Sequence, residues 1–370
     1  MTWGIICLVF LILLFAGVPI ACVMVMAAAL GAIAFSGYPD TVVVQQIYAG
    51  LNNYNSLAVP FFVISGGIAA AGGTSRSLIK IMQVLFGKFR GSLAIATILA
   101  SAFFAAITGT TLATIVAIGA IMISSLVEAG YPKRFTYGLV AAGGTLGILI
   151  PPSIPMVNLS TAMGASITRQ FTAGFVPGIL IALIWCAYSV FYCKKHDIVD
   201  AVDFTKEEKK AAIKDGIFAI MYPVIILGSI YGGFATPTEA AAISIIYVVA
   251  VELIYYREIK IPEMFKIAGN SAITSGTLLM LVSGSKVISW YVAANQIPAK
   301  VAGFISANIS NRYVLLLLLV VCFCILGCFL DIIPLSYILG PILSTTLIQY
   351  DVDFALFGVL CILCVQIGNL

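Results

Sequence analysis

Two apolar stretches carry residues whose types and spacing suit the binding of ions. The first is Thr108-Gly109-Thr110-Thr111, at the centre of an uncharged run over 92–127, and the second is GTLGILIPPSIP over 144–155. Threonine hydroxyls and the unpaired carbonyl groups at a helix C-terminus are oxygen ligands suited to Na⁺. Unpaired N–H groups at a helix N-terminus suit a carboxylate. Interrupted helices at these two places would therefore offer ligands to a cation and to an organic acid.

We expect carbonyl groups near Thr108 to meet those near Thr145–Gly147 around a sodium ion. The threonine hydroxyls at the first stretch either add ligands or cap the helix that follows. The predicted sodium-site residues are Thr108, Gly109, Thr111, Thr145 and Gly147, with Gly327 and Gly368 in the second half of the chain. The predicted substrate contacts are Thr110, Pro151, Pro152, Ser153, Asn158 and Asp331.

The elements that must position these residues are broken helices. Run 92–127 is too long for one span, and half-helices of about 16 residues reach roughly 24 Å, short of a ~30 Å hydrocarbon core. We expect a re-entrant hairpin there; two ordinary spans joined by a tight turn are the alternative. Pro151, Pro152 and Pro155 remove backbone donors, so run 135–163 is expected to unwind near its middle rather than only to kink.

The composition excludes a soluble globular protein. Of 370 residues, 62% are hydrophobic and 9% charged, whereas soluble domains carry about 25% charged residues. Apolar runs longer than ~20 residues, without alternating strand-like segments, predict an all-α polytopic membrane protein. The scattered Lys and Arg residues argue against nucleic acid as a partner. The single His lies in a polar segment and there is no H-E-x-x-H motif, so no enzyme is expected.

The two halves of the chain resemble each other. Pro19 precedes Pro237 by 218 residues, and Ile107-Thr108-Gly109 precedes Ile325-Leu326-Gly327 by the same interval. Most of the 19 basic residues fall on one face, which the positive-inside rule makes cytoplasmic, and equivalent elements then face opposite ways. We therefore expect two inverted-topology repeats. The first covers 1–193, with scaffold spans, an arm helix, hairpin 92–127 and broken span 135–163; a cytoplasmic linker with a short surface helix covers 194–215; and the second repeat covers 216–370, with hairpin 313–348.

Two acidic residues inside apolar sequence allow more than one interpretation. Asp331 follows the second break and either faces an ion or substrate or caps the next helix. Glu239, in Thr236-Pro237-Thr238-Glu239, fits an N-terminal capping box better than a functional site.

The sequence resembles the large membrane subunit of the TRAP (tripartite ATP-independent periplasmic) transporters. The motifs that carry the resemblance span nearly the whole chain: GTLGILIPPSIPM (144–156), AAITGTTLATIVAIGAIMI (105–123), FVPGI (175–179), ATPTEAAA (235–242) and GCFLDIIP (327–334). The resemblance implies an elevator-type transport domain made of two hairpins and two broken spans. Amphipathic segments near 75–90 and 295–311 are expected to act as arms. In the family the second half has its own Pro-Pro break, whose position here would fall beyond Leu370, so the chain is expected to be C-terminally truncated.

The resemblance also implies a function. It is Na⁺-coupled uptake of organic acid anions, such as C4-dicarboxylates, other carboxylates or sialic acids, across the bacterial inner membrane. The implied partners are a periplasmic solute receptor and a small four-helix membrane subunit, with the lipid bilayer as surroundings and Na⁺ as coupling ion but no other cofactor. A receptor-independent Na⁺/dicarboxylate symporter is the alternative, and a channel would require a continuous polar path. The sequence does not specify which acid is carried.

Overall fold

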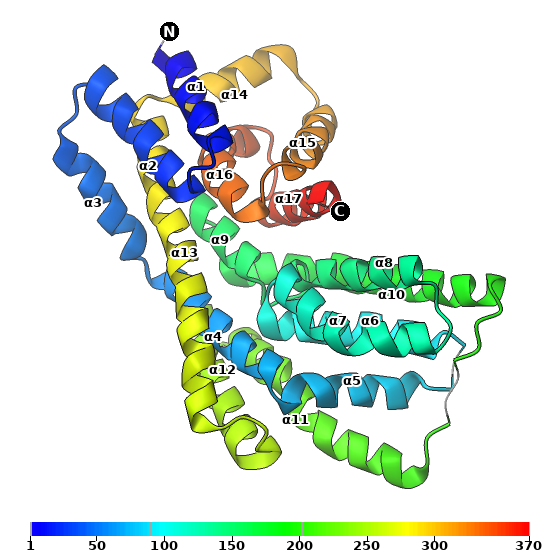
Figure 1. Cartoon of the computed structure of the whole chain (residues 1–370). Helices are drawn as coiled ribbons and strands as arrows, with labels where there is room; N and C mark the ends of the chain where they lie inside the picture. The colour runs from blue at the N-terminus through cyan, green and yellow to red at the C-terminus, as the bar shows by residue number, and fades with distance from the viewer. Residues whose placement is uncertain (1, 89, 201–202, 370) are drawn as a thin grey trace. The chain divides into compact units, whose positions relative to one another are not determined.

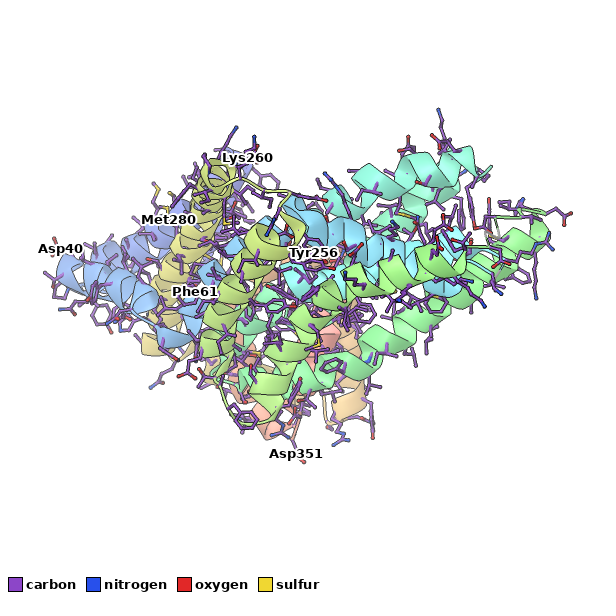
Figure 2. The ribbon with its side chains drawn as sticks, turned by 90° about the horizontal axis from the view of Figure 1, so that it is seen from below. Asp40, Phe61, Tyr256, Lys260, Met280 and Asp351 are labelled. Carbon is purple, nitrogen blue, oxygen red and sulfur yellow. The ribbon has the colours of Figure 1, made fainter. Side chains whose placement is uncertain are left out.

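Helices are the only regular elements in the computed structural model, which describes residues 2–88, 90–200 and 203–369. This confirms the all-α class. Within these residues, seven helices are long and apolar enough to cross a membrane, or up to eight if two helices that meet at 120° form one span. Large apolar side chains point outward along them, including Val176 at 73% and Ile246 at 72% exposure, and most side-chain atoms are carbon (Figure 2). Such surface suits contact with lipid.

The chain groups into two compact units. The central unit comprises Ala58–Met156 and Phe171–Ile273. Its helices α5, α6, α7 and α8 lie side by side (Figure 1). The helical elements that lie in it wholly or in part are α4 (Ala58–Ala71), α5 (Gly73–Phe86), α6 (Ser92–Thr108), α7 (Thr111–Glu128), α8 (Lys133–Thr145), η3 (Leu146–Ile148), α9 (Ile154–Met163), α10 (Ile167–Lys195), α11 (Lys206–Tyr231), α12 (Pro237–Ala250), η4 (Val251–Tyr256) and α13 (Ile261–Ala294).

The terminal unit comprises Met1–Leu57, Val157–Gln170 and Thr274–Leu370. It holds α15 and α16, the two helices of the predicted second hairpin; α17 packs along α15, and α14 packs along α16. Besides its parts of α9, α10 and α13, its elements are α1 (Thr2–Phe15), α2 (Ile20–Ala29), η1 (Leu30–Phe35), α3 (Asp40–Leu51), η2 (Tyr54–Leu57), α14 (Ile297–Asn308), α15 (Arg312–Gly327), α16 (Ile332–Gln349) and α17 (Phe354–Asn369). The two helices that meet at 120° are α14 and α15.

The helices of the central unit stop where the sequence predicted breaks. Helix α6 ends because Gly109 adopts a left-handed conformation (φ 63°), and α7 begins after Thr110, which is extended. Helix α8 ends at Thr145, one 3₁₀ turn follows, and helix resumes only at Ile154. The intervening Pro151 and Pro152 supply no backbone donors. The expected unwinding of run 135–163 is therefore confirmed.

Two buried carboxylates cap helices in the central unit from distant positions. Asp200 accepts hydrogen bonds from the backbone N–H groups of Gly91 (2.7 Å) and Leu93 (2.8 Å), at the start of α6. It also accepts one from the Tyr131 hydroxyl (2.6 Å). Burial, together with this carboxylate, raises the pKa of Tyr131, so the phenol stays protonated and remains a donor. Glu252 in η4 likewise accepts from the N–H groups of Gly73 and Thr74 at the start of α5, both at 2.9 Å.

Capping boxes define the starts of α11 and α12. Thr205 and Glu208 form one at the start of α11, which then continues without interruption to Tyr231. The expectation of a separate short helix in the linker is therefore wrong, because the helical part of the linker is the first turns of a long helix. Thr236 and Glu239 form the other box, which confirms the capping interpretation of Glu239.

Candidate functional site

The tip of the first hairpin, between α6 and α7, buries a pair of threonine hydroxyls. The Oγ1 atoms of Thr108 and Thr114 lie 3.1 Å apart, and Thr114 Oγ1 donates to the carbonyl oxygen of Thr110 at 2.8 Å. Thr108 Oγ1 also donates to the Phe104 carbonyl at 3.3 Å. Thr108 is 3% exposed and Thr114 is fully buried. The tip thus gathers hydroxyl and carbonyl oxygens away from the surface.

The unwound part of the broken span packs directly against this tip. The N–H of Ile154, at the start of α9, donates to the carbonyl oxygen of Gly109 at 3.1 Å. On the other side, a Cβ atom added to Gly147 would lie 2.7 Å from the Thr110 carbonyl oxygen. Only glycine allows so close an approach of two backbones. The C-terminal end of α8 and the N-terminal end of α9 therefore both lie at the hairpin tip.

A second layer of hydroxyls supports the tip from behind. The Tyr222 hydroxyl on α11 contacts Ser65 Oγ at 2.7 Å and the Ile107 carbonyl oxygen at 3.4 Å. Ser244 on α12 contacts Ser65 at 2.9 Å. Gly66, next to Ser65, allows α4 to approach Thr108, because an added Cβ atom would lie 2.8 Å from the Thr108 Cα. These contacts fix the position of the Ile107 and Thr108 backbone.

The structure brings several predicted residues of the central unit together. Thr108, Gly109, Thr110 and Gly147 meet at the tip, and a Cβ atom on Gly109 would lie 3.1 Å from the Pro152 carbonyl oxygen. The remaining predicted residues of the central unit are hydrogen-bonded within their own segment or lie beside the tip. Thr145 Oγ1 donates to its own helix at Ala142 (2.6 Å), Ser153 Oγ donates to the Ile148 carbonyl (2.7 Å), Thr111 opens α7 half-buried, and Pro151 is buried in the unwound segment.

The other predicted residues lie in the terminal unit. Gly327 and Gly368 pack against each other's backbone, since a Cβ atom on Gly368 would lie 2.8 Å from the Gly327 carbonyl carbon. Asn158 is buried, and its Oδ1 accepts from the Tyr337 hydroxyl on α16 at 3.0 Å. Its Nδ2 has no hydrogen-bond partner among the described residues. Asp331 is exposed, and its carboxylate accepts from the N–H of Ile332 (2.7 Å) as the N-cap of α16.

Sequence reasoning missed several residues of these clusters, including Thr114, Tyr222 and Tyr337. Thr114 lies four residues after Thr110, one helical turn into α7, and this spacing was the available signal. Tyr222 and Tyr337 come from other parts of the sequence, and no local pattern links them to Ile107 or Asn158. Within the described residues, no group of three or more His, Cys, Asp or Glu side chains could hold a metal ion. The oxygens gathered at the first tip belong to hydroxyl and carbonyl groups, which are neutral.

Known proteins match the chain along most of its length. Residues 7–370 match the family described as "Tripartite ATP-independent periplasmic transporter, DctM component". An isethionate TRAP transporter permease of Oleidesulfovibrio alaskensis is 34% identical over 360 residues, 97% of this chain and 57% of that protein. The C4-dicarboxylate TRAP large permease of Pseudomonas aeruginosa is 34% identical over 89% of this chain and 78% of its own length. The sialic acid TRAP large permease of Vibrio cholerae is 32% identical, over 97% and 84%.

A solved structure supports the fold separately. The YdaH transporter of Alcanivorax borkumensis aligns with a TM-score of 0.59 at 13% identity, covering 88% of this chain and 75% of that one. At this identity the likeness concerns the fold. The relatives are named as permease proteins, in line with a chain that is not an enzyme, and the apolar helices fit a multi-pass protein of the bacterial inner membrane. The chain therefore belongs to the DctM family of the tripartite ATP-independent periplasmic transporters.

Proposed function

We propose that the chain carries out Na⁺-coupled uptake of organic acid anions. The observation that supports this most directly is the first hairpin tip, where buried threonine hydroxyls and backbone carbonyls of Thr110 and Pro152 lie at the ends of interrupted helices. Oxygens of this kind are ligands for a hard cation. Helix interruptions inside an apolar protein are the usual place for coupling ions in secondary transporters.

The substrate site in this proposal uses neutral donors. Asn158 presents a buried Nδ2 group without a hydrogen-bond partner among the described residues. A carboxylate is a suitable acceptor for it, because leaving such a donor unpaired costs about 1–3 kcal/mol. The relatives' names mention isethionate, which carries a sulfonate, besides C4-dicarboxylates and sialic acid, so we commit only to an organic acid anion.

The energetics of such coupling are adequate. Each net positive charge that moves inward releases about 2.3 kcal/mol per 100 mV of membrane potential. At ~1.36 kcal/mol per decade this corresponds to roughly a fifty-fold accumulation of substrate. We further propose that a periplasmic receptor delivers the substrate, that a small membrane subunit completes the complex, and that both hairpins move together in an elevator-type domain.

The test is uptake of labelled organic acids into proteoliposomes that hold the chain and its small subunit, with and without Na⁺ and receptor. Thr108→Val combined with Thr114→Val removes the buried hydroxyl pair. We expect the Na⁺ concentration for half-maximal uptake to rise more than tenfold. Thr97→Val is the matched control, because this buried hydroxyl of the same helix donates only to the Leu93 carbonyl.

Two results would overturn parts of the proposal. If the double variant keeps the wild-type Na⁺ dependence, the ion does not bind at the first tip. If uptake proceeds at full rate without receptor, the chain works as a receptor-independent symporter instead.

A further inference from the structure

A cavity of about 500 Å³ lies between α8 and α10 in the central unit, near the start of α8 rather than at the hairpin tip. Phe135, Leu139 and Ala142 line it from α8, and Trp185, Tyr188 and Tyr192 line it from α10. Spacings of three, four and seven residues place each set on one face of its helix. The cavity is therefore a groove that runs along two helices. Its volume is within the range of small-molecule binding sites, about 300–1,000 Å³.

The floor of the groove is open and apolar. Gly138 lines it, and a Cβ atom added there would meet nothing within 4 Å. Beside the groove, α10 presents Leu183 and Ile184 outward, both more than half exposed. Trp185 also lines the groove, and its buried Nε1–H has no hydrogen-bond partner among the described residues. The site thus combines a hydrophobic channel with one unused donor.

Aromatic rings and positive charge gather at the end of the groove where α8 begins and α10 ends. Phe135 stacks on Tyr192 with ring centroids 4.0 Å apart, and Tyr192 lies 4.3 Å from the ring of His196. Arg134 lines the groove at this end. Three exposed lysines belong to the same helix ends, namely Lys133, Lys194 and Lys195. Aromatic rings beside basic residues are typical of the cytoplasmic interface of a membrane, where anionic headgroups lie.

We propose that this groove binds an anionic phospholipid, with its phosphate at Arg134 and an acyl chain lying between α8 and α10 toward Ala142. The Trp185 Nε1–H is placed to donate to an ester carbonyl of the lipid.

Trp185 makes the proposal measurable by fluorescence. The chain has three tryptophans, so Trp3→Phe with Trp290→Phe leaves Trp185 as the single emitter. The full chain is placed in vesicles of phosphatidylcholine, and brominated phosphatidylglycerol or brominated phosphatidylcholine is added as the quencher. We expect half-maximal quenching at a several-fold lower mole fraction of phosphatidylglycerol than of phosphatidylcholine.

Two variants test where the headgroup and the acyl chain of the lipid bind. Arg134→Gln should abolish the preference for phosphatidylglycerol, whereas Lys266→Gln, which removes an exposed charge of the same unit, should keep it. Gly138→Leu fills the open floor and should reduce quenching by both lipids. The melting temperature of each variant is measured alongside, so that loss of binding is distinguished from loss of folding.

Equal quenching by the two lipids would overturn the proposal, and so would a preference that survives Arg134→Gln. Absence of quenching by either lipid would also overturn it, since the groove would then be covered by protein. Inorganic phosphate at millimolar concentration should leave the preference unchanged; if it abolishes the preference, the basic end binds free phosphate and not a lipid.

Discussion

At the tip of the first hairpin every residue from Ala105 to Gly109 is buried, whereas Cys328 and Phe329 at the tip of the second are exposed. The helices around the two tips follow the same order, α6–α7–α8 and α15–α16–α17. A glycine packs on each tip: Gly147 in η3, directly after α8, and Gly368 in α17. The first tip adds hydroxyl contacts between side chains and backbone. The second is held by close backbone packing around Gly327 and Gly368, with a local cap at Asp331. The two tips, which share their order along the chain, are therefore stabilised in different ways.

The largest expected effect comes from disrupting the close backbone packing at a glycine that the two tips share. Gly147→Val and Gly368→Val each place a branched side chain where even a Cβ atom would lie within 2.7 Å of a backbone carbonyl oxygen. Backbone cannot move aside as a flexible side chain can, so we expect each variant to lose about 3 kcal/mol or more. The measurement is unfolding in mixed micelles. Gly276→Val is the control, since a Cβ atom there meets nothing within 4 Å; equal losses in all three variants would contradict the close-packing argument.

The first helices of the two hairpins, α6 and α15, are capped at their N-termini by residues at very different distances along the sequence. Asp200 caps α6 from the linker, whereas the Asn311 side chain caps α15 from the adjacent position, accepting from the Tyr313 N–H at 2.8 Å. Asp200→Ala leaves three donors unpaired, and we expect a loss of about 3 kcal/mol or more. Asn311→Ala should cost about 1 kcal/mol. Both are measured by unfolding in mixed micelles, and equal losses would show that the distant cap adds nothing beyond a local one.

The parts of the fold that the sequence predicted are those with a local cause. Gly109 and the pair Pro151-Pro152 determine where helices stop, because the conformations they favour depend only on neighbouring residues. Thr236 and Glu239 indicate a helix start for the same reason. Asp200 was not predicted, because its partners lie more than 60 residues away and nothing in KKHDIVDA distinguishes a buried carboxylate from a solvated one.

The residues of the candidate site also divide into those that a local sequence pattern predicts and those that it does not. Thr108, Gly109 and Gly147 were found because small and hydroxyl residues interrupt apolar runs, and the structure places them together. Thr114 lies inside a regular helix, and its spacing from Thr110 indicates a shared helix face but not that this face meets the tip. The inverted repeats and the ligand roles of the site residues stay predictions.

A smaller effect distinguishes the two residues that precede the second helix of each hairpin. Asp331 caps α16 with its side chain, but Thr110, at the same place before α7, makes no side-chain capping bond. Asp331→Ala should therefore lower the free energy of unfolding by about 1 kcal/mol. Thr110→Ala should change it by only a few tenths. Comparable losses in both variants would mean that the caps do not differ in solution.

The smallest effect compares two buried threonines of the hairpins. Thr346 on α16 is fully buried, and its Oγ1 has no hydrogen-bond partner among the described residues, whereas Thr114 on α7 is bonded to Thr108 and Thr110. Valine has the same shape as threonine without the hydroxyl. Removing an unpaired buried hydroxyl relieves a desolvation cost, so Thr346→Val should be neutral or stabilising by up to about 1 kcal/mol, and Thr114→Val should destabilise by a similar amount. Unfolding of both variants in mixed micelles gives the two signs. A loss of stability in Thr346→Val would show that the second hairpin also depends on a buried hydroxyl, away from its tip, and would contradict the difference expected between these two threonines.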